Sequence, residues 1–119
     1  MNSGEVHAWN ILDRQPIVVR WNNGAFTEFA PTDKPPSQNK WIGPSLVDLQ
    51  VNGFAGVDFQ QDNLTAEQLL HASSALEKNG CGKFCLTLIT SDWDLMINRL
   101  IKSKQLRDSY TELKKAICG

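Results

Sequence analysis

The sequence predicts an α/β protein in which a small β region precedes alternating strands and helices. Two observations lead to this prediction: a hairpin signal at Asn23-Gly24, and the order strand, helix, strand, helix from Leu46 onward. Strands that alternate with helices run parallel and are joined by right-handed crossovers. We therefore expect a β region over residues 1–42 and a separate α/β region over residues 43–119.

The N-terminal region has the composition of a β meander. Residues 17–21 read Ile-Val-Val-Arg-Trp, which are residues that favour strands. Asn23-Gly24 supplies the positive φ angles of a tight turn, and residues 25–29 form the return strand. Prolines among polar residues over 31–39 then predict a loop.

Residues 46–52 alternate strictly between apolar and polar side chains. One face of this predicted strand carries Val47, Leu49 and Val51, and the other carries Asp48, Gln50 and Asn52. The alternation is typical of a half-solvated surface strand. Because a glycine-bearing loop over 53–59 follows directly, it also fits a barrel strand whose polar groups converge on an active site. Periodicity alone leaves both interpretations open.

Two helices and one further strand follow. Thr65 and Gln68 form a capping box that begins the first helix, and Gly80 ends it. Residues 84–90 are mostly apolar and predict a strand buried on both faces. Ser91 begins the second helix, and a last helical segment is expected over 109–117. The predicted buried side of the second helix consists of Leu95, Met96, Ile97, Leu100 and Ile101.

The composition excludes several classes of protein. Twelve Lys plus Arg stand against 13 Asp plus Glu, so the net charge of −1 predicts no nucleic-acid or membrane partner. No apolar stretch approaches the roughly 20 residues that span a bilayer, and residues 1–5 show no secretory signal. An odd set of three cysteines argues against a disulfide framework and predicts inert, reduced thiols in the cytoplasm. The three are Cys81, Cys85 and Cys118.

The chemistry-bearing residues form no recognisable catalytic arrangement by spacing. His7 and His71 lie at no ligand spacing to each other or to the cysteines, and neither pairs with a Ser or Cys nucleophile. The segment 80–82 lacks the further glycine and the Lys-Ser/Thr of a phosphate loop. The run Asp48-x-Gln50-x-Asn52-Gly53 is therefore the feature that carries functional information.

Residues 43–53, Gly-Pro-Ser-Leu-Val-Asp-Leu-Gln-Val-Asn-Gly, resemble the first barrel strand of the amidohydrolase superfamily. There a Pro-Gly-hydrophobic-Ile-Asp segment leads into His-x-His-Gly. The chain is more closely similar to N-acetylglucosamine-6-phosphate deacetylases, some of which carry Gln-x-Asn at this position. Residues 56–59 resemble the loop that follows this strand in that family, and residues 87–90 resemble its second strand. Leu86 stands where proline is common in the family.

The resemblance implies a fold and an activity. Residues 43–119 would be the start of a TIM (β/α)8 barrel, about two βα units, preceded over 1–42 by part of a small β-sandwich subdomain. The complete family enzyme uses a divalent metal, zinc or similar, to hydrolyse N-acetylglucosamine 6-phosphate to acetate and glucosamine 6-phosphate in amino-sugar catabolism. Gln50 and Asn52 would occupy the position of the superfamily's first two metal ligands, with Asp48 as structural support. Because carboxamides are weak ligands, their implied role is to orient a bound water.

The family's remaining catalytic groups would lie beyond Gly119. These are a glutamate in a His-x-Glu-Gly-Pro pattern, two histidine ligands and a catalytic aspartate. We therefore expect no catalytic residue, no metal ligand and no cofactor in this chain, and no activity from it alone. Alternatives are a non-catalytic binding or regulatory module, or an independent α/β domain. Open sheet edges also predict a homo-oligomer or pairing with another chain.

Overall fold

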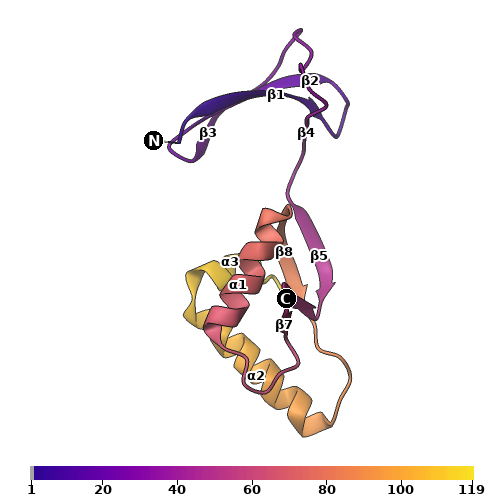
Figure 1. The fold of residues 1–119 in the computed structure, drawn as a ribbon, viewed down its shortest axis with the longest axis vertical. Helices are drawn as coiled ribbons and strands as arrows, with labels where there is room; N and C mark the ends of the chain where they lie inside the picture. Colours follow the sequence, from indigo (N-terminus) through magenta and orange to yellow (C-terminus); the bar gives the residue numbers. More distant parts are fainter. Residues whose placement is uncertain (1) are drawn as a thin grey trace. The chain divides into compact units, whose positions relative to one another are not determined.

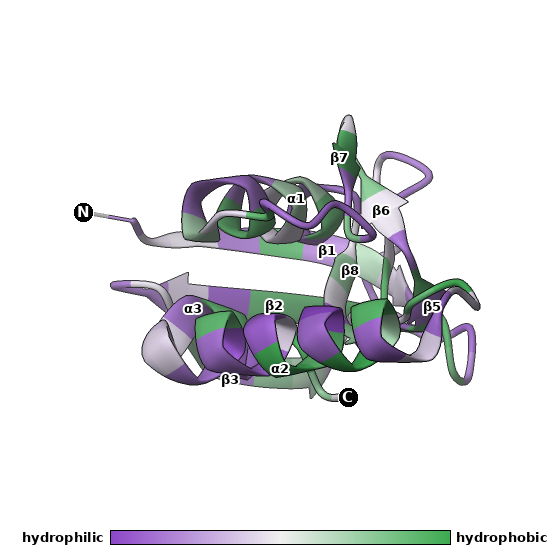
Figure 2. Cartoon of the chain, turned by 90° about the horizontal axis from the view of Figure 1, so that it is seen from below, coloured by the Kyte–Doolittle hydropathy of each residue, from purple (hydrophilic) through white to green (hydrophobic). Residues whose placement is uncertain are grey.

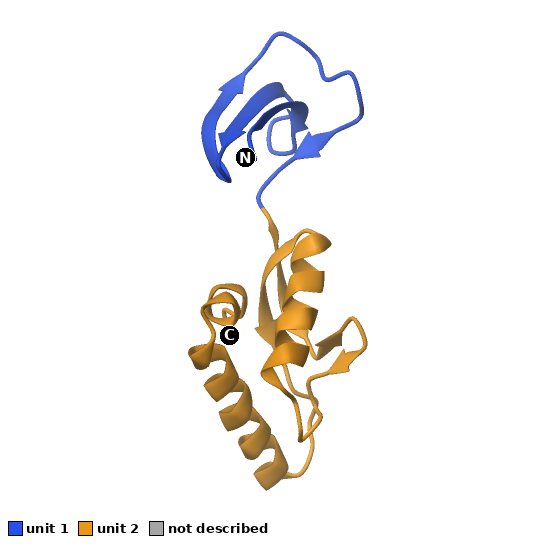
Figure 3. Cartoon of the chain, turned by 60° about the vertical axis from the view of Figure 1, so that its left-hand side comes forward, with its two compact units in different colours: residues 1–44 blue, residues 45–119 orange. Residues whose placement is uncertain are grey.

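The computed structural model describes residues 2–119. These divide into two compact units, one extending to Pro44 and one running from Ser45 to Gly119 (Figure 3). Each unit has its own sheet, and the second unit also contains the helices (Figure 1). In the described part of the chain, no helix is both long enough and apolar enough to cross a membrane.

The first unit is one four-stranded sheet in the order β3-β2-β1-β4. β1 (Gly4–Asn10), β2 (Pro16–Asn22) and β3 (Ala25–Pro31) form an antiparallel meander, and β4 (Trp41–Ile42) pairs in parallel with β1. Asn23 and Gly24 have φ angles of 52° and 77°, which confirms the predicted tight turn between β2 and β3. The buried side chains of this sheet are Ala8, Ile17, Val18 and Val19.

The second unit is built on a parallel strand pair. β5 (Leu46–Val51) lies beside β8 (Cys81–Leu86), and α1 (Ala66–Lys78) forms part of the connection between them. A small hairpin of β6 (Gly53–Phe54) and β7 (Val57–Asp58) precedes α1. This parallel arrangement confirms the mixed α/β class predicted from the order of the elements.

The last residues of the chain form a third parallel neighbour. α2 (Trp93–Ser109) and α3 (Thr111–Ala116) follow β8, and Ile117 then makes a parallel bridge to Phe84. The Cys118 amide donates to the Phe84 carbonyl at 2.9 Å, and the Leu86 amide donates to the Gly119 carbonyl at 2.7 Å. Three parallel segments therefore lie side by side in the order in which they occur along the chain.

Local sequence signals determine the ends of α1. The Thr65 hydroxyl accepts from the Gln68 amide at 3.2 Å, and the Gln68 side chain accepts from the Thr65 amide at 2.9 Å. This reciprocal pair is the predicted capping box. Gly80 lies just beyond the helix with φ of 87°, a left-handed conformation that glycine adopts without steric cost.

The core of the second unit lies where α1 packs on β8 and on the β6–β7 hairpin. The Phe59 and Phe84 rings stack with their centroids 6.2 Å apart, and both side chains are almost fully buried. α3 closes the core through Leu113. The buried members of this cluster are Val51, Val57, Phe59, Leu64, Leu69, Ala72, Leu76, Phe84, Leu113 and Ile117.

Two predicted elements differ from the structure. The strand expected over 84–90 begins at Cys81 and ends at Leu86, because its partner β5 ends at Val51. The second helix is capped by Asp92 rather than by Ser91. Both shifts place the element boundary where a hydrogen-bonding partner is present.

The predicted buried side of α2 is wrong in large part. Leu95, Leu100 and Ile101 are between 43% and 51% exposed, and the one buried residue of the helix is Ser103. α2 packs mainly against the short helix α3, which is too small to cover an apolar stripe. Figure 2 accordingly shows hydrophobic and hydrophilic turns alternating along its surface.

Candidate functional site

Gln50 lies near the carboxyl end of β5, Asn52 follows the strand directly and Asp48 lies in its middle, and all three predicted site residues are exposed. The Gln50 backbone amide donates to the Asp48 carboxylate at 3.0 Å. The pairing of β5 with β8 shifts register between Asp48 and Val51. Such irregularities redirect side chains and are common beside active sites. Here the irregular stretch contains Gln50.

The β6–β7 hairpin positions the residue that follows β5. A Cβ atom on Gly53 would lie 2.6 Å from the Val57 carbonyl oxygen, so no larger residue fits there without a backbone shift. Ala55 and Gly56 make the turn with φ angles of 51° and 80°. The Phe59 amide then donates to the Asn52 carbonyl at 3.0 Å, which holds the Asn52 backbone in place.

The loops after the two parallel strands meet at this edge. The Thr87 amide donates to the Val51 carbonyl at 2.9 Å, and the Gln60 side-chain amide donates to the Thr87 carbonyl at 3.4 Å. The Thr87 hydroxyl is buried without a protein partner. The Gln60 backbone is fixed in turn by a 2.8 Å bond to the Asp58 carboxylate. These contacts form one polar cluster at the carboxyl ends of β5 and β8.

Sequence reasoning did not assign Asp58, Gln60 or Thr87 to the site. A usable signal was present, because the carboxyl ends of neighbouring parallel strands lie at the same edge of a sheet. The loop after β5 and the first residue after β8 were therefore expected neighbours. Which side chains would touch depended on the conformation of the hairpin, which the spacing does not specify.

The side chains of this cluster do not fit a zinc site. Across residues 2–119, no group of three or more His, Cys, Asp or Glu side chains is placed to hold a metal ion. The predicted position offers the carboxamides of Gln50 and Asn52 and the carboxylate of Asp48. Zinc sites use three or four Cys, His or carboxylate ligands, so this donor set is insufficient.

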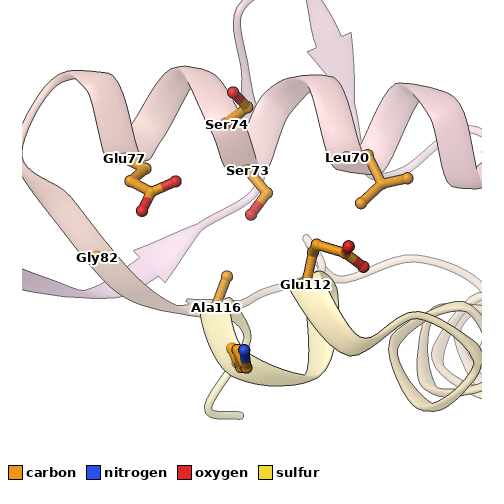
Figure 4. A pocket seen from close by; sticks show the side chains of 8 residues that line it. Leu70, Ser73, Ser74, Glu77, Gly82, Glu112 and Ala116 are labelled. Carbon is orange, nitrogen blue, oxygen red and sulfur yellow. The ribbon is translucent and has the colours of Figure 1, made fainter. Parts of the chain in front are cut away.

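A groove of about 400 Å³ lies between α1 and α3 and contains none of the predicted site residues. Figure 4 shows Glu77 of α1 and Glu112 of α3 projecting from the two helices. Lys115 is the single cation in the lining. Two carboxylates against one lysine make this groove a poor site for a sugar phosphate.

The fold and the site define a class of protein before any particular family. Parallel strands joined by helices, with polar groups gathered where the strands end, are typical of α/β proteins. The fold is that of a solved N-acetylglucosamine-6-phosphate deacetylase from Pasteurella multocida, with a TM-score of 0.57 and 19% sequence identity. That match covers 91% of this chain and 32% of the bacterial enzyme.

The sequence comparison agrees with the structural one. Over 56 residues, 45% of this chain, the sequence is 41% identical to the N-acetylglucosamine-6-phosphate deacetylase of Danio rerio, and the match spans 14% of that protein. No protein-family model matches the chain. The resemblance to a part of N-acetylglucosamine-6-phosphate deacetylase, predicted from residues 43–59 and 87–90, is thereby confirmed.

Proposed function

We propose that this chain is the N-terminal part of a metal-dependent amidohydrolase, with residues 43–119 forming the first βα units of its barrel. The supporting observation is the order β5, β8 and then residues 117–119, in which each parallel segment lies beside the previous one. A (β/α)8 barrel is built in this sequential order. Residues 1–42 would then be part of the small β-sandwich subdomain.

The reaction proposed for the complete enzyme is hydrolysis of N-acetylglucosamine 6-phosphate to glucosamine 6-phosphate and acetate. The 41% identity to a deacetylase of that name supports this substrate. Gln50 and Asn52, at the carboxyl end of β5, would orient a water at the metal of the complete enzyme, and Asp48 would support this strand end. We propose a cytoplasmic location, supported by the three free cysteines.

The chain alone is proposed to be inactive, because no group of side chains within residues 2–119 fits a zinc site. Acetate release from N-acetylglucosamine 6-phosphate, measured with added zinc, tests this directly. We expect no release above the buffer rate, with a complete deacetylase as the positive control. Turnover comparable with that control would show that the chain carries its own catalytic groups.

The coding sequence after the codon for Gly119 tests the family assignment separately from the activity. The proposal expects a third strand that continues into a His-x-Glu-Gly-Pro segment in the gene or in a longer transcript. An unrelated continuation in every transcript would contradict the assignment to this enzyme. Such a continuation would not affect the result of the acetate-release assay, so the two tests can fail separately.

The edge of β5 that faces away from β8 favours a second candidate function, a non-catalytic module that binds another chain. In the part of the chain that the structure describes, β5 pairs along one edge with β8, and its other edge has no strand partner. Leu46, Val47 and Leu49 on this strand are 66%, 52% and 75% exposed. Free edges with apolar side chains favour pairing with another strand. We take a second copy of the chain as the partner.

Sedimentation of the chain over a range of concentrations tests this module. Self-association that is lost in Leu49→Lys would support pairing through β5, because a lysine on an edge strand opposes pairing. Leu12→Lys is the matched control, since Leu12 is an exposed leucine of the other unit. A chain that stays monomeric at all concentrations would rule this module out.

A further inference from the structure

Two thiols far apart in the sequence lie side by side in the second unit. Cys85 belongs to β8. Cys118 belongs to the segment that lies along the edge of β8 opposite to β5. Their sulfur atoms are 3.8 Å apart. The preceding residues, Phe84 and Ile117, form the parallel bridge, so the two cysteines occupy neighbouring positions on adjacent strands. The sequence predicts inert thiols, but Cys118 is exposed and Cys85 is half-buried.

The backbone geometry permits a bond between these sulfurs. Neighbouring strands lie about 4.8 Å apart, and disulfides join Cα atoms that are about 4.4 to 6.8 Å apart. A disulfide shortens the sulfur–sulfur distance to about 2.05 Å. Forming the bond therefore requires the two side chains to rotate so that the sulfurs move together from 3.8 Å.

The third cysteine is placed differently. Cys81 lies four residues before Cys85 on the same strand, and at about 3.3 Å per residue the two are about 13 Å apart. Its sulfur atom donates to the Lys83 carbonyl at 3.2 Å. Cys81 therefore serves as an internal control for any reaction that depends on two neighbouring thiols.

We propose that Cys85 and Cys118 form a dithiol site that a small-molecule disulfide, such as glutathione disulfide, oxidises reversibly to an intramolecular disulfide. The Cys118 thiol, the more exposed of the two, loses its proton and attacks one glutathione sulfur. The glutathione S–S bond breaks, and one glutathione leaves and takes up a proton. Cys85 then loses its proton and attacks the Cys118 sulfur of the mixed disulfide, and the second glutathione leaves as a thiol.

The surroundings of Cys85 agree with its role as the second thiol to react. Its hydrogen bond with Cys118 raises the pKa of the Cys85 thiol, and burial and the negative charge of Asp48 raise it further. A thiol with a raised pKa is a poor attacker of a free oxidant. It still reacts when the mixed disulfide is held within reach on the next strand.

Peptide mapping of the whole chain tests the proposal. The chain is equilibrated with glutathione disulfide at low protein concentration, its remaining thiols are blocked, and it is digested with trypsin. Cleavage after Lys78, Lys83, Arg99 and Lys115 separates the three cysteines into peptides 79–83, 84–99 and 116–119. We expect peptides 84–99 and 116–119 to be linked, lighter by two hydrogen atoms than their sum, and separated again by reduced glutathione.

Variants assign the bond. Cys81→Ser should give the same linked pair, whereas Cys85→Ser should stop at a glutathione adduct on Cys118. Three results would overturn the proposal. They are stable glutathione adducts on both Cys85 and Cys118 without a link, a link that includes peptide 79–83, or a covalent dimer on a non-reducing gel in place of the linked monomer.

Discussion

β5 and β8 are neighbours in one sheet and have similarly apolar sequences, yet five of the six residues of β5 are exposed and only one of the six of β8 is. β8 lies between β5 and residues 117–119, and its Phe84 is 1% exposed. β5 has a partner along one edge, and its Leu49 is 75% exposed. α1 packs on β8 and on the β6–β7 hairpin. The number of neighbours around a strand, more than its own pattern, therefore decides which side chains are buried.

The largest expected effect comes from removing the ring at the centre of β8. Phe84→Ala deletes a fully buried side chain that stacks on Phe59, so unfolding of the second unit should become easier by about 3–5 kcal/mol. Leu49→Ala on β5 should change stability by less than about 0.5 kcal/mol. Urea unfolding followed by circular dichroism measures both. Equal losses would mean that the two strands share one environment.

A smaller effect is expected at the hairpin that connects the end of β5 to the core. In Gly53→Ala, the new methyl group meets the Val57 carbonyl oxygen at 2.6 Å, and such overpacking costs about 1–3 kcal/mol. The Phe59 amide should then exchange with solvent faster. The control is Gly56→Asn, since asparagine tolerates a positive φ and nothing lies within 4 Å of the new Cβ. A Gly53→Ala protein as stable as this control would mean that the hairpin moves freely.

The two helix caps extend the comparison from strands to helices. Thr65→Ala removes the cap of α1, which packs on β8, and should lower the stability of the second unit by about 1 kcal/mol. Asp92→Ala removes the cap of α2, whose apolar side chains are largely exposed. Here we expect fraying of the first turn with little change in overall stability. Amide exchange along both helices distinguishes local fraying from unfolding of the whole unit. If both variants lowered the stability of the second unit equally, α2 would be part of its cooperative core.

Local signals predicted what depends on a few consecutive residues. Thr65, Gln68 and Gly80 identified the ends of α1, and Asn23-Gly24 identified the hairpin. The alternation also placed Gln50 and Asn52 at the end of a strand, where the structure has them, and their role at a site stays a prediction.

Contacts between distant residues were not predictable from spacing. Cys85 and Cys118 meet because residues 117–119 pair with β8, and Gln60 meets Thr87 because the hairpin turns back toward β8. The exposure of Leu100 and Ile101 likewise depends on what packs against α2. Each of these results depends on which distant segment packs against a strand or helix. The residue pattern within that strand or helix does not specify its packing partner.

The smallest effect concerns β2, the strand of the first unit that has partners on both edges but an exposed charged residue. Arg20 donates to Glu5 at 2.6 Å and also pairs with Glu28 across the neighbouring strands. The hydrogen bond from Arg20, and then that from His7, lowers the pKa of Glu5 below its ordinary value of 4.5. A lowered pKa means that the folded state binds fewer protons than the unfolded state. The resulting stability is therefore present above pH 4.5 and is lost as the pH falls through the folded pKa.

Arg20→Leu should return the Glu5 pKa toward 4.5 and weaken this dependence on pH, because only the His7 hydrogen bond then remains. Lys34→Leu, a change at another exposed cation of the same unit, should leave the Glu5 pKa lowered. NMR of the Glu5 carboxyl resonance through an acid titration measures the Glu5 pKa in the unchanged chain and in both variants. An unchanged Glu5 pKa in Arg20→Leu would mean that solvent screens this exposed pair completely. In that case β2, which has a partner on each edge, would gain its stability from its buried face alone, as β8 does through Phe84.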